Sequence, residues 1–338
     1  MPLSAGRIPA CFSACCCACL TCCDVSGSLV MGTERWSDVR EVGFLRGMRL
    51  LFWVYRVGGY HAFRAVLQPV LLYYFFTHKL SRTASLDYLR RLRQYFGSDA
   101  MPPATWWTAY RHFNAFAGST LDRLGAWSNS SILDRINFPE RDLLLKQLDS
   151  GQGAVLLGAH LGNMEVLRGL STRNRRLTLN ILVHTRNADM FNRLLRDVVG
   201  ERDVTLIEVT EMSPATAIRL KGCIDRGEFI AILADRVPVS SESRTRMIPF
   251  LGAPARFPDG PFILASLLKC PVYTLFSTRQ GKGYDIRCQK LANSVKLPRR
   301  GREEAITAYM QRYVQELEIN VQRAPLQWFN FYPFWDQK

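Results

Sequence analysis

The chain has 338 residues, of which 48% are hydrophobic, and this is enough for a large core in one domain or two. Lysine and arginine outnumber aspartate and glutamate by 44 to 29, and the net charge of +15 indicates an acidic partner. Because zinc-finger spacing, an RNP-like aromatic motif and a lysine-rich tail are all missing, nucleic acid is not predicted as that partner. The arginines lie among apolar and aromatic residues, which favours an anionic membrane surface.

Residues 1–30 differ from the rest of the chain because seven of the ten cysteines lie between Cys11 and Cys23. Three interpretations stay open: an upstream translation with the functional start at Met31, a metal-binding cysteine cluster, and an export leader. We treat this stretch as a non-native or leader extension. The remaining cysteines lie in apolar surroundings, which predicts buried thiols in a reducing compartment.

Residues 43–76 are strongly apolar and rich in aromatic side chains, but arginines interrupt them at four positions. The longest run without a charge, residues 65–76, is about half of the ~20 residues that a membrane-spanning helix needs. The pattern therefore predicts amphipathic helices that lie in a membrane interface, within a region spanning residues 31–100. An ordinary pair of core helices is the alternative.

From residue 81 to residue 150 the apolar side chains follow helical spacing, and after residue 153 short apolar strands alternate with helices. This alternation predicts an α/β domain over residues 101–338, with a mixed, largely parallel sheet flanked by helices. Strands are expected at 154–159, 177–183, 204–207, 229–233 and 272–277, with a further edge strand at 284–289. Helices are expected at 137–148, 164–170, 189–199, 214–226, 261–268 and 303–321.

The stretch GAVLLGAHLGNMEVL, residues 153–167, contains the strongest candidate site. His160 and Glu165 are five residues apart, a spacing that separates two side chains on either a helix or a strand. They meet only if the chain passes from a strand through a tight turn into a helix, and Gly162 permits such a turn. A histidine oriented by a carboxylate is suited to act as a general base.

The chain lacks the motifs of enzymes that use their own nucleophile or a bound phosphate. It has no G-x-S-x-G elbow, no cysteine with a convincing partner, no Walker A loop and no H-E-x-x-H. A histidine base without a protein nucleophile indicates that the substrate supplies the nucleophile. Acyl transfer from a thioester to a hydroxyl fits this pattern and needs neither a metal nor another cofactor.

The motif HLGNME resembles the His-x4-Asp/Glu signature of the lysophospholipid acyltransferase superfamily, and the chain is most similar to its lipid A biosynthesis (lauroyl/myristoyl) acyltransferase branch. The resemblance runs from about residue 36 to residue 335 and includes AHLGNMEVLRG, LVHTRNADMFN, FIAILADRVP and IPFLGAPARFPDGPFILA. It implies that His160 is the general base, Glu165 its partner, an acyl-acyl carrier protein the donor and a lipid or glycolipid hydroxyl the acceptor. It also implies a place on the cytoplasmic face of a bacterial inner membrane and a role in lipopolysaccharide-type lipid biosynthesis.

Four further residues are predicted to bind substrate. Arg186 follows a strand and is suited to hold a phosphate or an oxyanion, an assignment that the resemblance also implies. Asp235 in LADR corresponds to a family aspartate, with an ion pair to Arg236 as the alternative. Asn163 lies at the helix start, where backbone N–H groups are expected to stabilise the oxyanion, and Arg246 lies in the basic stretch 243–261, which we treat as a loop.

Two departures from related patterns limit the choice of acceptor. Phe257-Pro258-Asp259-Gly260-Pro261 replaces the Pro-Glu-Gly-Thr-Arg of glycerol-phosphate enzymes, and residues 330–332 differ from the usual end of the lipid A enzymes. The sequence thus predicts a membrane-associated O-acyltransferase whose acceptor is not fixed as lipid A. A thioesterase that uses the same dyad and a non-catalytic membrane lipid-binding protein are the alternatives.

Overall fold

The computed structural model describes residues 58, 62, 64–128, 135–164, 166, 177–183, 204–208, 214–237 and 244–335. The predicted leader at residues 1–30 lies outside the described residues. So do the helix predicted at residues 189–199 and, apart from residues 164 and 166, the one predicted at residues 164–170.

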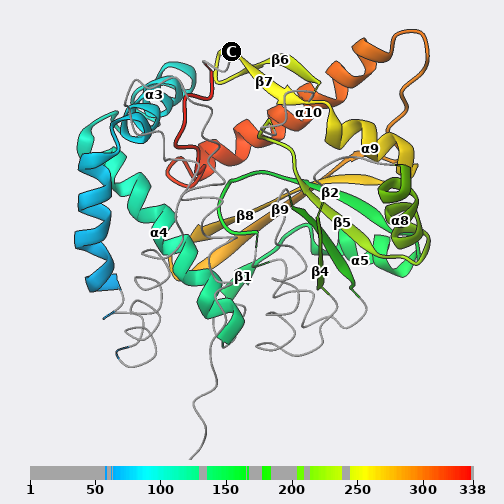
Figure 1. The fold of residues 1–338 in the computed structure, drawn as a ribbon, viewed down its shortest axis with the longest axis horizontal. Coiled ribbons are helices and arrows are strands. Elements are labelled where there is room, and N and C mark those ends of the chain that lie inside the picture. The colour runs from blue at the N-terminus through cyan, green and yellow to red at the C-terminus, as the bar shows by residue number, and fades with distance from the viewer. Residues whose placement is uncertain are drawn as a thin grey trace, which may run out of the picture.

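Seven strands of the described chain form one sheet in the order β1-β9-β8-β2-β5-β3-β4 (Figure 1). They are β1 Ile136–Asn137, β2 Ala154–Gly158, β3 Leu179–Val183, β4 Val204–Glu208, β5 Phe229–Leu233, β8 Val272–Gln280 and β9 Gly283–Ala292. Only β8 and β9 pair antiparallel among these neighbours, which confirms the prediction of a mixed, largely parallel sheet. The strand predicted at the edge, β9, lies one place inside it because the two-residue β1 pairs with its outer side.

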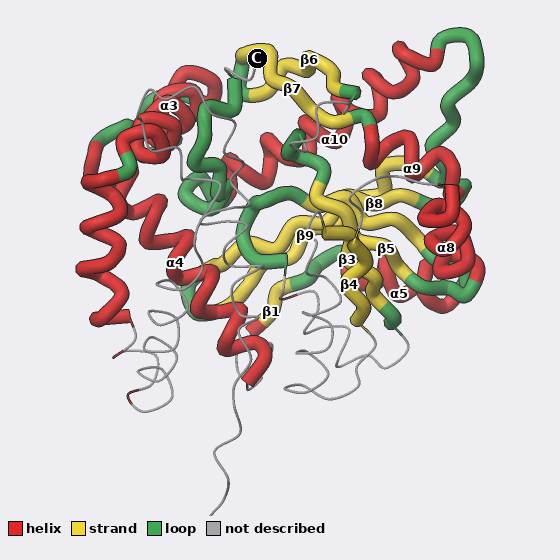
Figure 2. Tube along the Cα trace, viewed as in Figure 1, coloured by secondary structure: helices red, strands yellow, loops and turns green. Residues whose placement is uncertain are grey.

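Helices pack on both faces of this sheet, as Figure 2 shows. On one face, α8 (Pro214–Asp225), α9 (Gly260–Leu268) and α10 (Arg302–Arg323) contribute to one apolar cluster. On the other face, α5 (Arg141–Asp149) packs against a second cluster. The helices α3 (Lys79–Phe96) and α4 (Trp106–Ser128) lie beside the sheet (Figure 1). These helices confirm the ones predicted from periodicity in the same regions.

The strand β2 is buried along its whole length, as its sequence AVLLG predicts. Successive side chains of a strand point to opposite faces. Accordingly, Val155 and Leu157 belong to the cluster under α10, whereas Ala154 and Leu156 belong to the cluster under α5. Both faces of β2 are therefore covered, and only its carboxyl end can carry a reactive side chain toward a substrate.

The stretch that we treated as a loop, residues 243–261, instead contains the antiparallel hairpin of β6 (Thr245–Phe250) and β7 (Ala253–Pro258). Proline is unusual in paired strands, and the three prolines within β6 and β7 conceal the pairing from a sequence pattern. Leu251 and Gly252 form the two-residue turn, and both have positive φ angles, of 50° and 78°. The prediction of a loop at this place is wrong.

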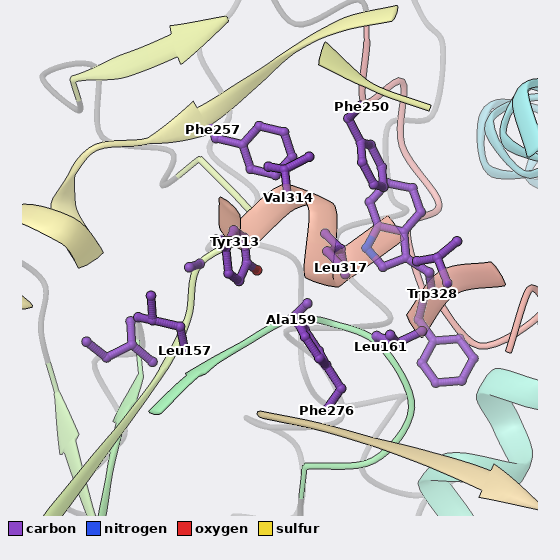
Figure 3. Packing of buried hydrophobic residues seen from close by; sticks show 14 of the residues in the cluster. Leu157, Ala159, Leu161, Phe250, Phe257, Phe276, Tyr313, Val314, Leu317 and Trp328 are labelled. Atoms are coloured by element: carbon purple, nitrogen blue, oxygen red, sulfur yellow. The ribbon is translucent and has the colours of Figure 1, made fainter. Parts of the chain in front are cut away.

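Residues 325–335, here named the closing segment, form part of the core rather than a surface cluster. Trp328, Phe329 and Phe334 are no more than 2% exposed. Figure 3 shows Trp328 between Phe250 of the hairpin and Leu161, which follows β2. The same apolar cluster includes residues of α3, so the core continues across residue 100, where the sequence places a region boundary.

The N-terminal helical layer presents large apolar side chains outward. Residues 64–77 are helical, with Leu71 and Phe75 buried and Tyr73 and Phe76 exposed by 70% and 60%. Trp106 and Trp107, at the start of α4, are exposed by 55% and 67%. Among the described residues, none of the helices combines the length and hydropathy that crossing a bilayer requires.

Candidate functional site

The candidate site lies where two neighbouring parallel strands end. Gly158 at the end of β2 is in register with Leu233 at the end of β5, and the amide of Ala234 donates to the carbonyl of Gly158 at 3.0 Å. His160 lies two residues after the end of β2, and Asp235 lies two residues after the end of β5. Because parallel strands present their carboxyl ends at one edge of the sheet, the register brings these two residues side by side.

Asp235 binds His160 through both of its carboxylate oxygens. Its Oδ1 lies 2.8 Å from Nδ1 of the imidazole, and its Oδ2 accepts the backbone N–H of His160 at 2.9 Å. The carboxylate is 1% exposed, whereas the side chain of His160 is 18% exposed. With the ring proton on Nδ1, the lone pair is on Nε2, which is the arrangement that a general base needs.

The carboxylate of Asp235 remains ionised although it is buried. Burial alone would raise its pKa, but the charge of His160, the hydrogen bonds from His160 and the charge of Arg236 together lower that pKa below its ordinary value. The indole Nε1 of Trp328 donates a further hydrogen bond to Oδ2 at 3.1 Å. A negative charge that is fixed and hydrogen-bonded in this way can orient an imidazole and stabilise its protonated form.

The turn after His160 is held by backbone hydrogen bonds to two distant segments. The amide of Gly162 donates to the carbonyl of Gln327, and the amide of Asn163 donates to the carbonyl of Ser277, each at 2.8 Å. Gly162 has a φ of +70°, and a Cβ there would lie 1.9 Å from the carbonyl oxygen of Ser277. Both amides therefore already have backbone acceptors, and our expectation that they stabilise an oxyanion stays a prediction.

The side chain of Asn163 points into a buried polar network beneath the turn. Its Nδ2 donates to the carbonyl of Ser119 at 3.3 Å and to the hydroxyl of Tyr284 at 3.4 Å. The Tyr284 hydroxyl donates in turn to Asp122 at 2.6 Å, and Arg279 lies 3.1 Å from the same carboxylate oxygen. These contacts give Asn163 a part in fixing the turn, and its predicted contact with substrate stays a prediction.

The other predicted residues have separate positions. Arg246 on β6 lies 2.9 Å from Asp259 and also pairs with Glu303 of α10, so its guanidinium ties the hairpin to two helices. Glu165 and Arg186 lie outside the described residues, and their roles stay predictions. Within the described part of the chain, no three histidine, cysteine, aspartate or glutamate side chains are grouped so that they could hold a metal ion.

A buried histidine supports the closing segment from below. His112 of α4 is fully buried, lies with Nε2 2.9 Å from the carbonyl of Trp328, and has the hydroxyl of Ser85 2.9 Å from its Nδ1. A carbonyl can only accept, so Nε2 carries the proton and Nδ1 accepts from the hydroxyl. Burial lowers the pKa of His112 to about 4, although the hydrogen bond to Trp328 opposes this shift.

This buried histidine predicts a defined loss of stability in acid. The unfolded chain takes up the proton below pH 6.5, whereas the folded protein resists it until about pH 4. The stability that the neutral His112 side chain contributes is therefore fully present above pH 6.5. The free energy of unfolding falls by about 3 kcal/mol as the pH drops to 4. Denaturant titrations at several pH values should show a shallower acid slope in His112→Gln, because glutamine does not titrate. Equal slopes in the two proteins would contradict the prediction.

With this geometry in place, comparison with known families identifies the chain. The model of the bacterial lipid A biosynthesis acyltransferase family matches residues 109–337, about two thirds of the chain. The chain belongs to this family. The matched stretch contains His160, Asp235 and the closing segment, so every contact described around His160 lies within the family region. Comparison with curated proteins finds no match.

Membership of the lipid A biosynthesis acyltransferase family confirms that the protein is an acyltransferase of the lipid A type. Such an enzyme moves an acyl group from a donor to a lipid acceptor. The contact between His160 and Asp235 was not predicted from the sequence. The available signal was that both residues follow buried strands of a parallel sheet by the same number of positions.

Proposed function

We propose that the protein is a membrane-associated O-acyltransferase that moves a fatty acyl chain from acyl carrier protein to a hydroxyl of a lipid or glycolipid. The observation that carries the proposal is the 2.8 Å contact between His160 and the buried Asp235. It supplies a partly exposed imidazole with a fixed tautomer at the end of a buried strand. Family membership supplies the reaction class.

The transfer proceeds in two steps. His160 Nε2 takes the proton of the acceptor hydroxyl as its oxygen attacks the thioester carbonyl carbon, and Asp235 stabilises the imidazolium that forms. The tetrahedral intermediate then collapses, the carbon–sulfur bond breaks, and the imidazolium returns the proton to the leaving thiolate. The product is an ester of the acceptor and a free carrier thiol. In this proposal Arg186 stabilises the oxyanion.

The contact at Nδ1 of His160 limits the role that we propose for Glu165. A ring N–H donates to one strong acceptor at a time, and Asp235 already occupies that position at 2.8 Å. We therefore assign the orientation of His160 to Asp235. Glu165, which the family motif pairs with His160, acts in this proposal through another atom of the site.

Carrier protein as donor is supported by charge. The chain has a net charge of +15, and complementary charge accelerates the encounter with an acidic carrier protein. Acyl carrier protein is found where thiols are reduced. The described cysteines Cys223, Cys270 and Cys288 are free and buried, which suits the cytoplasmic face of the inner membrane.

Membrane association is supported by the outward aromatic face of the N-terminal layer. Tyr73 and Trp107 are both more than two-thirds exposed, and aromatic side chains of this kind favour the lipid–water interface. The double variant Tyr73→Ser/Trp107→Ser is expected to bind anionic vesicles about tenfold more weakly in sedimentation assays. The matched control is Ile218→Ser/Leu267→Ser, which removes exposed apolar side chains from α8 and α9. Equal losses in both double variants would contradict this assignment.

The function is tested by following three quantities in one reaction. The purified protein is given radiolabelled acyl-acyl carrier protein and vesicles that contain a hydroxylated glycolipid, and thioester loss, acylated lipid and free fatty acid are measured. Transfer predicts that acylated lipid accounts for the thioester lost. Rapid release of free acid without acylated lipid would identify a thioesterase, and the absence of any turnover would indicate a lipid-binding protein.

A further inference from the structure

The indole of Trp328 is buried beside the site and has an unusual acceptor. Its Nε1 donates to Oδ2 of Asp235 at 3.1 Å, and its side chain is completely buried. A buried tryptophan N–H needs an acceptor, and a backbone carbonyl is often sufficient. Trp335, seven residues later in the same aromatic cluster, has this ordinary arrangement because its Nε1 donates to the carbonyl of Phe250 at 3.1 Å. Trp328 instead donates its only side-chain N–H to the carboxylate that orients His160.

The indole cannot easily move away from that carboxylate. Aromatic rings surround it, with centroid distances of 5.1 Å to Tyr88, 5.1 Å to Phe250 and 4.9 Å to Phe334. Figure 3 shows the indole nitrogen facing inward between Phe250 and Leu161. Its backbone is also fixed, because Trp328 bridges to Leu161 and its carbonyl accepts from His112.

The residues next to Trp328 fix the segment in the same way. The side-chain amide of Gln327 accepts the N–H of Arg279 at 2.7 Å and donates to the carbonyl of Arg279 at 2.8 Å. The N–H of Phe329 donates to the carbonyl of His160 at 2.8 Å. The indole N–H therefore has a direction fixed by the backbone on both sides of it.

Three donors then determine the orientation of the Asp235 carboxylate. Nδ1 of His160 binds Oδ1, while the backbone N–H of His160 and the indole N–H bind Oδ2. Without the indole, the amide of His160 would be the one hydrogen-bond donor described on Oδ2, and the carboxylate could turn about its Cβ–Cγ bond. Such a turn would lengthen the bond to Nδ1 and release the tautomer that the base requires.

We propose that Trp328 is a positioning residue for acyl transfer, whose indole N–H fixes the Asp235 carboxylate and through it the Nδ1–H tautomer of His160. This inference rests on the proposed function, in which His160 is the general base. Because an indole N–H does not dissociate at ordinary pH, Trp328 takes no part in proton transfer itself.

The test replaces the donor and keeps the shape of the ring. Trp328→Phe removes the N–H together with part of the ring, and site-specific replacement of Trp328 by 3-benzothienylalanine exchanges the N–H for sulfur in a ring of nearly equal size. Trp335→Phe is the matched control, since it removes an indole hydrogen bond from the same aromatic cluster without touching Asp235.

Both Trp328 replacements are expected to lower kcat by about 10- to 100-fold while KM changes by less than about threefold. The carboxylate that loses its donor carries more charge toward His160, so the acid limb of the kcat/KM profile should move to higher pH. Trp335→Phe should keep kcat within about threefold and leave the pH profile in place.

A second readout separates this inference from the proposed function. ¹⁵N-histidine NMR of the wild-type protein should show His160 protonated at Nδ1, and the benzothienyl variant should show a mixture of both tautomers. If the wild type transfers no acyl group but the tautomer changes as described, the proposed function is wrong. The role of Trp328 in fixing the tautomer of His160 would still hold.

Any one of three results obtained with folded variants would overturn the positioning role. They are a benzothienyl variant with wild-type kcat and pH profile, a Trp335→Phe loss as large as that of Trp328→Phe, and an unchanged His160 tautomer. If Trp328→Phe does not fold, the benzothienyl variant decides. Failure of that variant to fold would also overturn the proposal, because the N–H would then serve stability alone.

Discussion

Acyl transfer by a His160→Ala variant is expected to be about 10⁴-fold slower in kcat than transfer by the wild-type protein, because the variant loses its general base. The side chain of His160 is 18% exposed, and Asp235 keeps its hydrogen bonds from the backbone of residue 160 and from Trp328, so the loss of the ring should not unfold the protein. The measurement is single-turnover transfer from acyl-acyl carrier protein at saturating acceptor, together with near-ultraviolet circular dichroism. Single-turnover rates separate the chemical step from binding and product release.

The control for this variant is His78→Ala. His78 lies between the helix 64–77 and α3, where its ring stacks on Tyr74 at a centroid distance of 3.7 Å. It has no described contact with Asp235, so kcat should stay within about threefold of the wild type. A His160→Ala variant that folds and keeps more than about a tenth of the wild-type rate would eliminate His160 as the base.

The second large effect is expected from Asp235→Asn, which should lower kcat by about 10³-fold or more and leave KM nearly unchanged. The asparagine amide group would face Nδ1 of His160 with a donor and so favour the opposite tautomer, with the proton on Nε2. Trp328 and the backbone of His160 would retain an acceptor in the asparagine oxygen, so the fold should persist. Transfer kinetics and thermal unfolding, measured on one preparation, distinguish these two effects.

A buried carboxylate elsewhere provides the control for Asp235→Asn. Glu318 of α10 is 9% exposed, accepts the amide of Leu251 at 2.7 Å and binds the hydroxyl of Tyr95 at 3.1 Å. Glu318→Gln should cost stability in the hairpin turn without slowing the chemical step. If Asp235→Asn transfers at nearly the wild-type rate while Glu165→Gln is inactive, Glu165 rather than Asp235 orients the base.

The sheet and its helices were predictable because each element carries its own local pattern. The apolar runs at β2, β5 and β8 and the helical spacing of α10 depend on neighbouring residues only. The hairpin of β6 and β7 was not predictable in this way, because its prolines resemble those of a loop while its pairing is set by the fold.

The site was predictable only in part, because its contacts depend on the order of strands in the sheet. His160 stands out from its local spacing, but the choice of its carboxylate does not. Glu165 is near in sequence, whereas Asp235 becomes a neighbour only because β5 lies next to β2. The pairing of Asp235 with Arg236, which adjacency suggests, contributes a favourable charge without replacing the bond to His160.

The hydrogen bonds of the turn amides could not be predicted from the local sequence either. A glycine at residue 162 and a helix start after it predict exposed N–H groups, since helix termini leave such donors unsatisfied. That argument considers the turn by itself. In the folded protein β8 and the closing segment arrive from far along the chain and supply acceptors for both amides.

The closing segment has a consequence for synthesis of the protein on the ribosome. Residues 327–329 bind the turn at residues 160–162 and the carboxylate of Asp235, yet they are translated long after both. Until they emerge, the nascent chain carries a nearly complete sheet whose apolar face, destined for Trp328, remains uncovered. Chains that end before this point should be bound by chaperones or degraded by proteases, and they should not act as slow catalysts. The reason is that such long-range contacts form late and leave folding intermediates with exposed apolar surface. We therefore expect activity in the cell only from chains whose synthesis has passed this segment.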